Sequence, residues 1–287
     1  MQKAFLEAGG NAEVNAAIPD SIYYGPNEAT VVLTNLATLD ATELVRVNAE
    51  QFALDREAGI FADSPNILYT ATGADLDLRP GQQIRLSVER PGEETAVAET
   101  VLLEPIEINR PTDVVRIDDY RRPLIMSWTR GDNAAVFDVR VIFEIRELFP
   151  NAPDQNRTVE LVWELNGGFV PGADQASDTQ VRFEVNPEAF YQFLGANLEP
   201  IDGIVRRFQN FDLQVSAAGQ EVLDLRNLEG ANAGLTSSQS LPRYTNLLGG
   251  IGLITGRTTA RKEGILFDGG SLDSLRDGRW TRELNFR

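Results

Sequence analysis

Hydrophobic and polar residues alternate with a period of two along much of the chain, which is the pattern of β-strands with one buried face. The alternation predicts strands at residues 83–89, 136–145, 158–165, 181–185 and 210–216. Gly, Pro, Asn and Asp fill the gaps between these runs, as they do in turns. Because strands do not alternate with helices, we expect antiparallel sheets that are each packed on one side.

One helix interrupts this pattern, at residues 186–197. Asn186 is a favoured N-cap residue, and Pro187 follows it at the first helical position. Phe190, Phe193 and Leu194 have the spacing of a single helix face. We therefore expect this helix to lie on a sheet with its aromatic side chains in the core.

Two prolines and several polar residues at 105–113 separate the strand-rich halves of the chain. We therefore predict an all-β fold of two antiparallel β-sandwich domains, residues 1–108 and 109–287. Trp128 lies on an early strand of the second domain, where immunoglobulin-like and fibronectin type III-like sandwiches bury a Trp. The second domain would carry the helix as an insertion, followed by a C-terminal extension.

The composition restricts the chemistry of the chain. It has 26 Lys and Arg against 43 Asp and Glu, a net charge of −17, which argues against a nucleic-acid partner and against electrostatic binding to an anionic membrane. The chain has no Cys and no His, so Ser-His-Asp and Cys-His catalysis and the usual zinc, copper and iron ligands are excluded. We expect no catalytic residues, no bound cofactor and no metal site. No run of residues reaches the length of a membrane-spanning helix.

The most distinctive motif is the run RYTNLLGGIGLITGR, residues 243–257. A phosphate-binding P-loop needs two glycines five positions apart followed by Lys and Ser or Thr, and no pair of glycines in the run has that separation. A dinucleotide-binding fingerprint would need a third glycine at position 255, which is Thr255. Glycines among strands mark bulges or close backbone approaches instead, so we interpret the run as a conformational motif and an interface edge. We expect Arg243 and Arg257 to pair with the acidic surface, and Tyr244 and Asn246 to tie the segment down.

Acidic clusters offer a weaker indication of chemistry. Asp118 and Asp119 are adjacent, and neighbours on a strand point to opposite faces, so we expect a solvated turn with local ion pairs. Asp268, Asp273 and Asp277 lie in a glycine-rich segment without the spacing of an EF-hand calcium loop. We expect a turn-rich C-terminal hairpin at residues 267–278 and, earlier in the chain, a small polar loop at residues 229–240.

Tyr23, Tyr24 and Tyr69 lie near predicted strand ends. Exposed tyrosines at such places would form a platform for a glycan, and the alternative is that they pack with only their hydroxyl groups in water. The pattern alone leaves both interpretations open.

Three segments together resemble a known family: DSIYYG, DREAGIFADSPNILYT and PRYTNLLGGIGLITGR. Their order and spacing are similar to those of uncharacterised outer-membrane lipoproteins of Bacteroidota, close to the domain-of-unknown-function lipoproteins encoded beside TonB-dependent receptors. Residues 253–256 depart from the family pattern. The residues of these segments that we expect to form an interface or a structural motif are Phe61, Pro65, Asn66, Tyr69, Arg243, Tyr244, Asn246, Gly250, Gly252 and Arg257.

The resemblance implies an exported protein that is held at the outer membrane by a lipidated cysteine, preceding the present sequence, with no other membrane attachment. It implies no catalytic residues, because the family has none assigned. We expect a non-enzymatic accessory subunit that binds another envelope protein, such as a TonB-dependent receptor or a secretion complex. The alternative is a surface module that binds a glycan or a peptide.

Overall fold

The computed structural model shows a chain that is mostly β, with several antiparallel sheets and three helices among the described residues. It describes residues 18, 22–54, 59, 62, 64–73, 76–175, 179–232 and 243–287. Contacts within the chain divide it into two compact units. Unit 1 comprises Met1–Leu102 and Asp224–Thr255, and unit 2 comprises Leu103–Leu223 and Gly256–Arg287.

The chain therefore returns to unit 1 for residues 224–255 before it ends in unit 2. Such a return was not expected from the sequence, where the last part of the chain was assigned to the second domain throughout. Contacts do not show which parts fold independently, so the domains predicted at residues 1–108 and 109–287 stay a prediction.

Unit 1 contains a five-stranded sheet in the order β14-β6-β5-β1-β2 and a two-stranded sheet, β3-β4. All strand pairs in both sheets are antiparallel. A short 3-10 helix, η2 (Ala49–Phe52), follows β3. The strands are β1 (Thr30–Asn35), β2 (Ala41–Glu43), β3 (Val45–Asn48), β4 (Ile67–Thr70), β5 (Gln83–Glu89), β6 (Ala96–Val101) and β14 (Leu247–Leu248).

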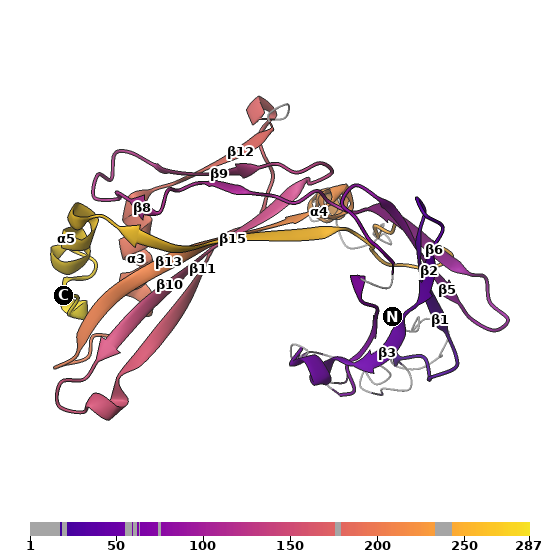
Figure 1. The fold of residues 1–287 in the computed structure, drawn as a ribbon, viewed down its shortest axis with the longest axis horizontal. Helices are drawn as coiled ribbons and strands as arrows, with labels where there is room; N and C mark the ends of the chain where they lie inside the picture. The colour runs from indigo at the N-terminus through magenta and orange to yellow at the C-terminus, as the bar shows by residue number, and fades with distance from the viewer. Residues whose placement is uncertain are drawn as a thin grey trace. The chain divides into compact units, whose positions relative to one another are not determined.

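Unit 2 contains a five-stranded sheet in the order β11-β10-β13-β15-β8 and a three-stranded sheet in the order β12-β9-β7. Figure 1 shows the three-stranded sheet lying over one face of the five-stranded sheet. All pairs are antiparallel except β15 with β8, which run parallel. The strands are β7 (Ile108–Arg110), β8 (Val114–Val115), β9 (Leu124–Thr129), β10 (Val136–Leu148), β11 (Arg157–Phe169), β12 (Gln180–Val185), β13 (Val205–Ala218) and β15 (Arg257–Phe267).

The two sheets of unit 2 share one hydrophobic core. Trp128 on β9 is fully buried and packs against Phe137 on β10, with ring centroids 5.5 Å apart. Phe143 on β10 is surrounded by aromatic rings of β11, β13 and α3, at centroid distances of 5.7–6.4 Å. The core therefore joins both sheets and α3 into one packed body.

A buried ion pair lies in the same unit. The Arg206 side chain is 1% exposed, and its Nη2 lies 2.6 Å from Oε1 of Glu147. The guanidinium also donates to the carbonyl oxygens of Leu284 and Glu199, and Arg157 donates to the second Glu147 oxygen. Because both charges have hydrogen-bonding partners, their burial is tolerated.

The helices α3 (Pro187–Asn197) and α5 (Gly269–Asp277) lie at the same end of unit 2 (Figure 1). The third helix, α4 (Gln220–Asn232), follows β13 directly. Short 3-10 helices η4 (Pro153–Gln155), η5 (Ala173–Gln175) and η6 (Arg282–Leu284) complete the regular structure of the described residues in this unit.

The predicted β-rich fold with antiparallel sheets is confirmed, and so is the helix at 186–197. The Asn186 side chain caps α3 by accepting a hydrogen bond from the Glu188 amide at 3.0 Å. The buried position of Trp128 agrees with the prediction as well. The assignment to the immunoglobulin or fibronectin type III class stays a prediction.

Two expectations about the C-terminal half were wrong. Residues 269–277 form α5 in place of the expected hairpin, because Asp268 acts as an N-cap that accepts from the Ser271 amide at 2.9 Å. Residues 229–232, expected in a polar loop, belong to α4. In both cases the glycines of the segment suggested turns although the neighbouring residues favour a helix.

Candidate functional site

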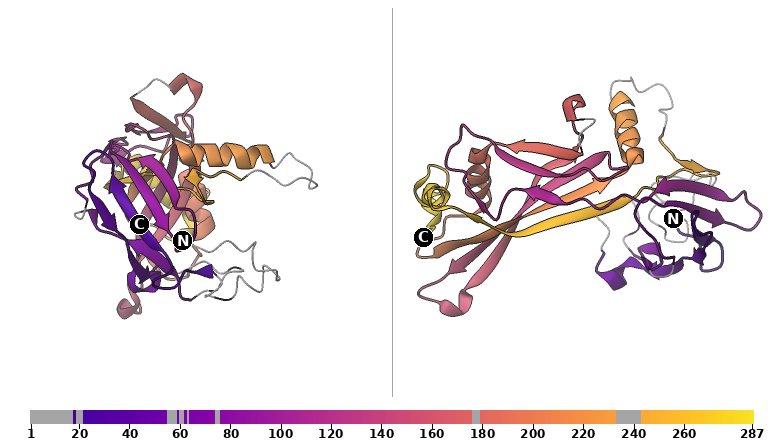
Figure 2. Two further views of the ribbon diagram at one scale, coloured as in Figure 1. Left: turned by 90° about the vertical axis from the view of Figure 1, so that its right-hand side faces the viewer. Right: turned by 45° about the horizontal axis from the view of Figure 1, so that its top comes forward.

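The structure brings most of the predicted interface residues into unit 1 but not into one cluster. Arg243, Tyr244, Asn246, Gly250 and Gly252 lie in the segment around β14, at the edge of the five-stranded sheet (Figure 2). The last residue of the motif, Arg257, begins β15 and belongs to unit 2. Pro65, Asn66 and Tyr69 lie in and just before β4, whereas Phe61 lies outside the described residues.

Residues 245–254, which we call the Thr245–Ile254 loop, are tied together by their own hydrogen bonds. The Thr245 hydroxyl oxygen accepts from the amides of Leu247 and Gly252, both at 3.1 Å. The Asn246 side chain accepts from the Ile254 amide at 3.0 Å and donates to the Ile254 carbonyl at 2.8 Å. These bonds close the loop at both ends, so its tip is held in a defined conformation.

Gly249 occupies a position in the loop where a side chain would be strained, unlike Gly250 and Gly252. Gly249 has a φ of +72°, and a Cβ there would lie 3.0 Å from the Thr95 carbonyl oxygen. At Gly250 and Gly252 a Cβ would make only ordinary contacts, at 3.5 Å or more. The predicted close backbone approach is thus real, but it occurs at Gly249 and not at the two glycines of the family pattern.

The tip of the loop exposes large aliphatic side chains. Leu248 is 78% exposed and Ile251 is 68% exposed, and Leu253 is exposed as well. Leu247 and Leu248 form β14 and pair with Ala98 and Val97 of β6, so the loop continues the sheet at its edge. A rigid loop that presents neighbouring aliphatic side chains to solvent is a feature of protein-binding surfaces.

The interface residues predicted in this motif are its polar and glycine residues, and Leu248 and Ile251 are not among them. The signal was present, because LLGGIG places aliphatic residues among glycines where a period-two strand would be interrupted. The expected ion pairs of Arg243 and Arg257 with acidic residues are not found in the described parts of the chain.

The segment around Asn66, which also carries the family resemblance, is a structural connection. The Asn66 amide donates to the Asn48 side chain at 3.2 Å, and the Asn66 side chain donates to the Leu54 carbonyl at 3.2 Å. Tyr69 packs against both small hydrophobic clusters of unit 1, and its hydroxyl oxygen is buried with no hydrogen-bond partner among the described residues. The segment thus holds β4 against β3 and η2.

The tyrosines considered as a glycan platform do not form one on the surface. Tyr23 is buried and belongs to the core of unit 1, and Tyr24 and Tyr69 are half-buried. Among the described residues, large exposed aromatic side chains occur elsewhere, at Phe52 in unit 1 and at Tyr120 and Trp280 in unit 2.

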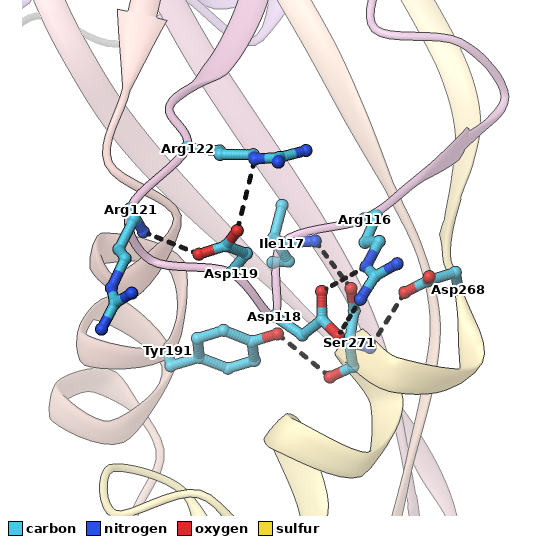
Figure 3. Close-up of polar contacts among 9 residues, drawn as sticks. All are labelled: Arg116, Ile117, Asp118, Asp119, Arg121, Arg122, Tyr191, Asp268 and Ser271. Atoms are coloured by element: carbon cyan, nitrogen blue, oxygen red, sulfur yellow. Dashed lines mark hydrogen bonds and ion pairs between the residues drawn. The ribbon is translucent and has the colours of Figure 1, made fainter.

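The adjacent aspartates Asp118 and Asp119 lie in the segment after β8 and point to different partners (Figure 3). Arg116 donates to both carboxylate oxygens of Asp118, at 2.7 and 3.2 Å. Asp119 accepts from the Arg121 amide at 3.1 Å and lies 3.4 Å from the Arg122 side chain. This is the predicted turn with local ion pairs.

The same segment is attached to helices α3 and α5. The Ile117 amide donates to the Ser271 hydroxyl at 2.7 Å, and the Tyr191 hydroxyl donates to the Ser271 carbonyl at 3.1 Å (Figure 3). A Cβ at Gly270 would lie 2.5 Å from an Asp118 oxygen, so the glycine permits α5 to approach this carboxylate. These contacts fix residues 116–122 against α3 and α5.

The shifted pKa values of Asp118 and Tyr191 agree with a structural role for these side chains. The hydrogen bond from Arg116 lowers the pKa of Asp118, so this carboxylate is ionised at neutral pH. Burial raises the pKa of Tyr191 far above its ordinary value, so its hydroxyl stays protonated and serves as a hydrogen-bond donor. Within the described residues, no group of three or more acidic side chains is arranged to hold a metal ion.

Comparison of the chain with protein-family models and with curated proteins found no match. Among the helices of the described residues, none has the length and apolar character needed to cross a membrane. The Thr245–Ile254 loop is therefore the candidate functional site on its geometry alone.

Proposed function

We propose that this protein is a non-enzymatic accessory subunit of the cell envelope that binds another envelope protein through the Thr245–Ile254 loop. The observation that carries the proposal is the exposure of Leu248 and Ile251 on a loop whose conformation is fixed by Thr245 and Asn246. Because the loop is ordered before binding, little conformational entropy is lost when a partner covers these side chains.

The partner is a protein with an apolar pocket and a basic rim. Aliphatic side chains at the centre of an interface gain most when a pocket excludes water from them. The net charge of −17 favours a partner of opposite charge and disfavours insertion of the same loop into an anionic membrane. The resemblance to lipoproteins encoded beside TonB-dependent receptors supports such a receptor, or a secretion complex, as the partner and an N-terminal lipid anchor at the outer membrane.

Site-specific crosslinking in the native host tests the proposal. A photoreactive phenylalanine analogue at position 248 or 251 is expected to form an adduct with one integral envelope protein. The matched control is position 39, because Leu39 is 76% exposed in unit 1 but lies between β1 and β2. The double variant Leu248→Ser, Ile251→Ser is expected to abolish co-purification of the same protein.

Three results would contradict the proposal. Adducts with lipid alone would place the loop in a membrane. Equal adducts from positions 39, 248 and 251 would show that the loop has no specific partner. Hydrolysis of a polymer by the purified protein would replace the non-enzymatic role with a catalytic one.

A further inference from the structure

Unit 2 exposes two aromatic side chains on segments that are far apart in the sequence. Tyr120, in the segment after β8, is 37% exposed, and Trp280, in the segment after α5, is 41% exposed. Neither residue is among the interface residues predicted from the sequence. Both belong to unit 2, and the Thr245–Ile254 loop belongs to unit 1, so a function of this surface is separate from the one proposed above.

Helix α3 brings the two aromatic residues together. Glu188 and Tyr191 are three residues apart on α3 and therefore share one face of the helix. The Trp280 indole nitrogen donates to Glu188 Oε1 at 3.0 Å, and the Tyr120 ring lies with its centroid 5.8 Å from that of Tyr191. Glu188 and Arg279 are close enough to Tyr120 for their charges to act on its hydroxyl.

Both exposed rings pack on α3. Tyr120 packs on Tyr191, and Trp280 is held by the contacts that follow. A Cβ at Gly195 of α3 would lie 2.4 Å from the Trp280 carbonyl oxygen, so this glycine permits the backbone of Trp280 to rest on the helix. Arg279 pairs with Glu188 and places its guanidinium 4.8 Å from the Trp280 ring. Rings that are already oriented bind a ligand with a small entropic cost.

The charges around these rings differ from the charge of the whole chain. Four guanidinium groups, of Arg116, Arg121, Arg122 and Arg279, balance the four carboxylates of Asp118, Asp119, Glu188 and Asp268. The Arg121 side chain forms no ion pair within the described residues, and Figure 3 shows its guanidinium turned away from Asp119. On a protein with a net charge of −17, a surface whose arginines balance its carboxylates leaves the Arg121 guanidinium able to bind an anionic group.

We infer that the surface formed by Tyr120, Arg121, Glu188, Arg279 and Trp280 binds an acidic polysaccharide, one whose sugar rings carry carboxylates. A pyranose ring has apolar C–H faces, which match exposed aromatic rings, and hydroxyl groups at its edge, which match the paired Glu188 and Arg279. The carboxylate of such a sugar is bound by the planar fork of Arg121. An acidic peptide would use the arginines but has no comparable ring face for Tyr120 and Trp280.

Calorimetric titration of the whole chain with oligogalacturonate tests this inference, with dextran as the neutral sugar and poly-glutamate as the acidic peptide. We expect binding of oligogalacturonate alone. Tyr120→Ala, Trp280→Ala and Arg121→Ala are each expected to weaken it at least tenfold, whereas Trp280→Phe, which keeps a ring, is expected to retain most of the affinity. The matched controls are Phe52→Ala, an exposed aromatic residue of unit 1, and Arg207→Ala, an exposed arginine of unit 2.

Trp280 also packs on α3, so thermal unfolding of each variant is measured beside binding. Tyr120→Ala and Arg121→Ala keep the test decisive if Trp280→Ala unfolds, because neither removes a contact between the C-terminal segment and α3. Absence of oligogalacturonate binding to the wild type, equal binding of dextran, tighter binding of poly-glutamate, or full affinity in folded Tyr120→Ala and Arg121→Ala variants would each overturn the inference.

Discussion

The two units bury their hydrophobic residues in different ways. Unit 2 has one core that joins two sheets and α3, and its strands β10, β11 and β13 are 13, 13 and 14 residues long. In unit 1 the described strands have at most seven residues. Its buried hydrophobic residues form two small clusters around Ile67 and Val31, and Ala49, Leu76, Ile84 and Ala98 are buried outside both.

This difference has an energetic consequence. Hydrophobic stabilisation grows with the apolar area removed from water, so long strands that face an aromatic core contribute more than short ones. Unit 1 also leaves Leu248 and Ile251 in solvent, where they contribute nothing to its stability. We therefore expect unit 2 to be the more stable part of the molecule and unit 1 to present apolar side chains for binding.

The largest effect is expected at Phe143, which is fully buried among other aromatic rings of unit 2. Phe143→Ala is expected to lower the free energy of unfolding by about 4 kcal/mol, because it removes a buried ring and leaves a cavity. Denaturant unfolding followed by Trp fluorescence measures this, since all three tryptophans, Trp128, Trp163 and Trp280, lie in unit 2. An effect below about 1 kcal/mol would contradict a tightly packed core.

The buried ion pair of unit 2 comes next. Glu147→Gln is expected to cost about 3 kcal/mol, because Arg206 would keep its charge in a buried site without its partner. Arg85→Ala is a matched control, because it removes one partner of the exposed pair with Glu99 and is expected to change stability by less than about 1 kcal/mol.

The same pair makes stability depend on pH. Burial raises the pKa of Glu147, but the hydrogen bonds from Arg206 and Arg157 outweigh this and leave the pKa below its ordinary value of 4.5. The folded state therefore binds the proton less readily than the unfolded state, and the contribution of Glu147 is lost as the pH falls below 4.5. Wild type should lose stability there more steeply than Glu147→Gln, and parallel curves for the two proteins would show that the pair is not responsible.

A smaller effect is expected in the core of unit 1. Ile67→Val removes one methylene group from a buried side chain of β4 and is expected to cost about 1 kcal/mol. Hydrogen exchange of the β3 and β4 amides, followed by mass spectrometry, would show faster exchange in this unit alone. Equal acceleration in β10 and β13 would mean that the two units unfold together.

The smallest effect on stability is expected at the loop tip. Leu248→Ser changes a side chain that is mostly in solvent, so its free energy of unfolding should stay within about 0.5 kcal/mol of wild type. Thermal unfolding measures this, and Leu247→Ser is the comparison, because Leu247 is half-buried and pairs with Ala98. A large loss from Leu248→Ser would show that the residue belongs to the fold and not to an interface.

The strands β5, β10, β11, β12 and β13 and the helix at Asn186 were predicted because their signals are local. Side chains alternate across a pleated strand whatever the rest of the chain does, and an N-cap such as Asn186 acts on amides two residues away. Helix α5 was missed although its cap is also local, because Gly269 and Gly270 favoured a turn. Only the approach of Asp118 explains why position 270 is a glycine.

The candidate site could be predicted in part. The run at 243–257 was identified as a conformational motif at an interface edge, and Asn246 ties it down as expected. The exposed residues Leu248 and Ile251 were not identified, because a sequence does not show which aliphatic side chains find a core. For the same reason, the exposure of Tyr120 and Trp280 was not predicted. Helix α3 brings these two residues together from positions 160 residues apart.

By itself, the sequence determined the β-rich architecture, the position of α3, the acidic charge and the absence of thiol and imidazole chemistry. Those properties depend on residue types and on neighbours within a few positions. The tertiary structure alone decided that residues 224–255 return to unit 1, that Gly249 is the glycine with a steric role, and that Leu248 and Ile251 face solvent. Burial and close approach depend on remote partners, and only the folded chain specifies which partners meet.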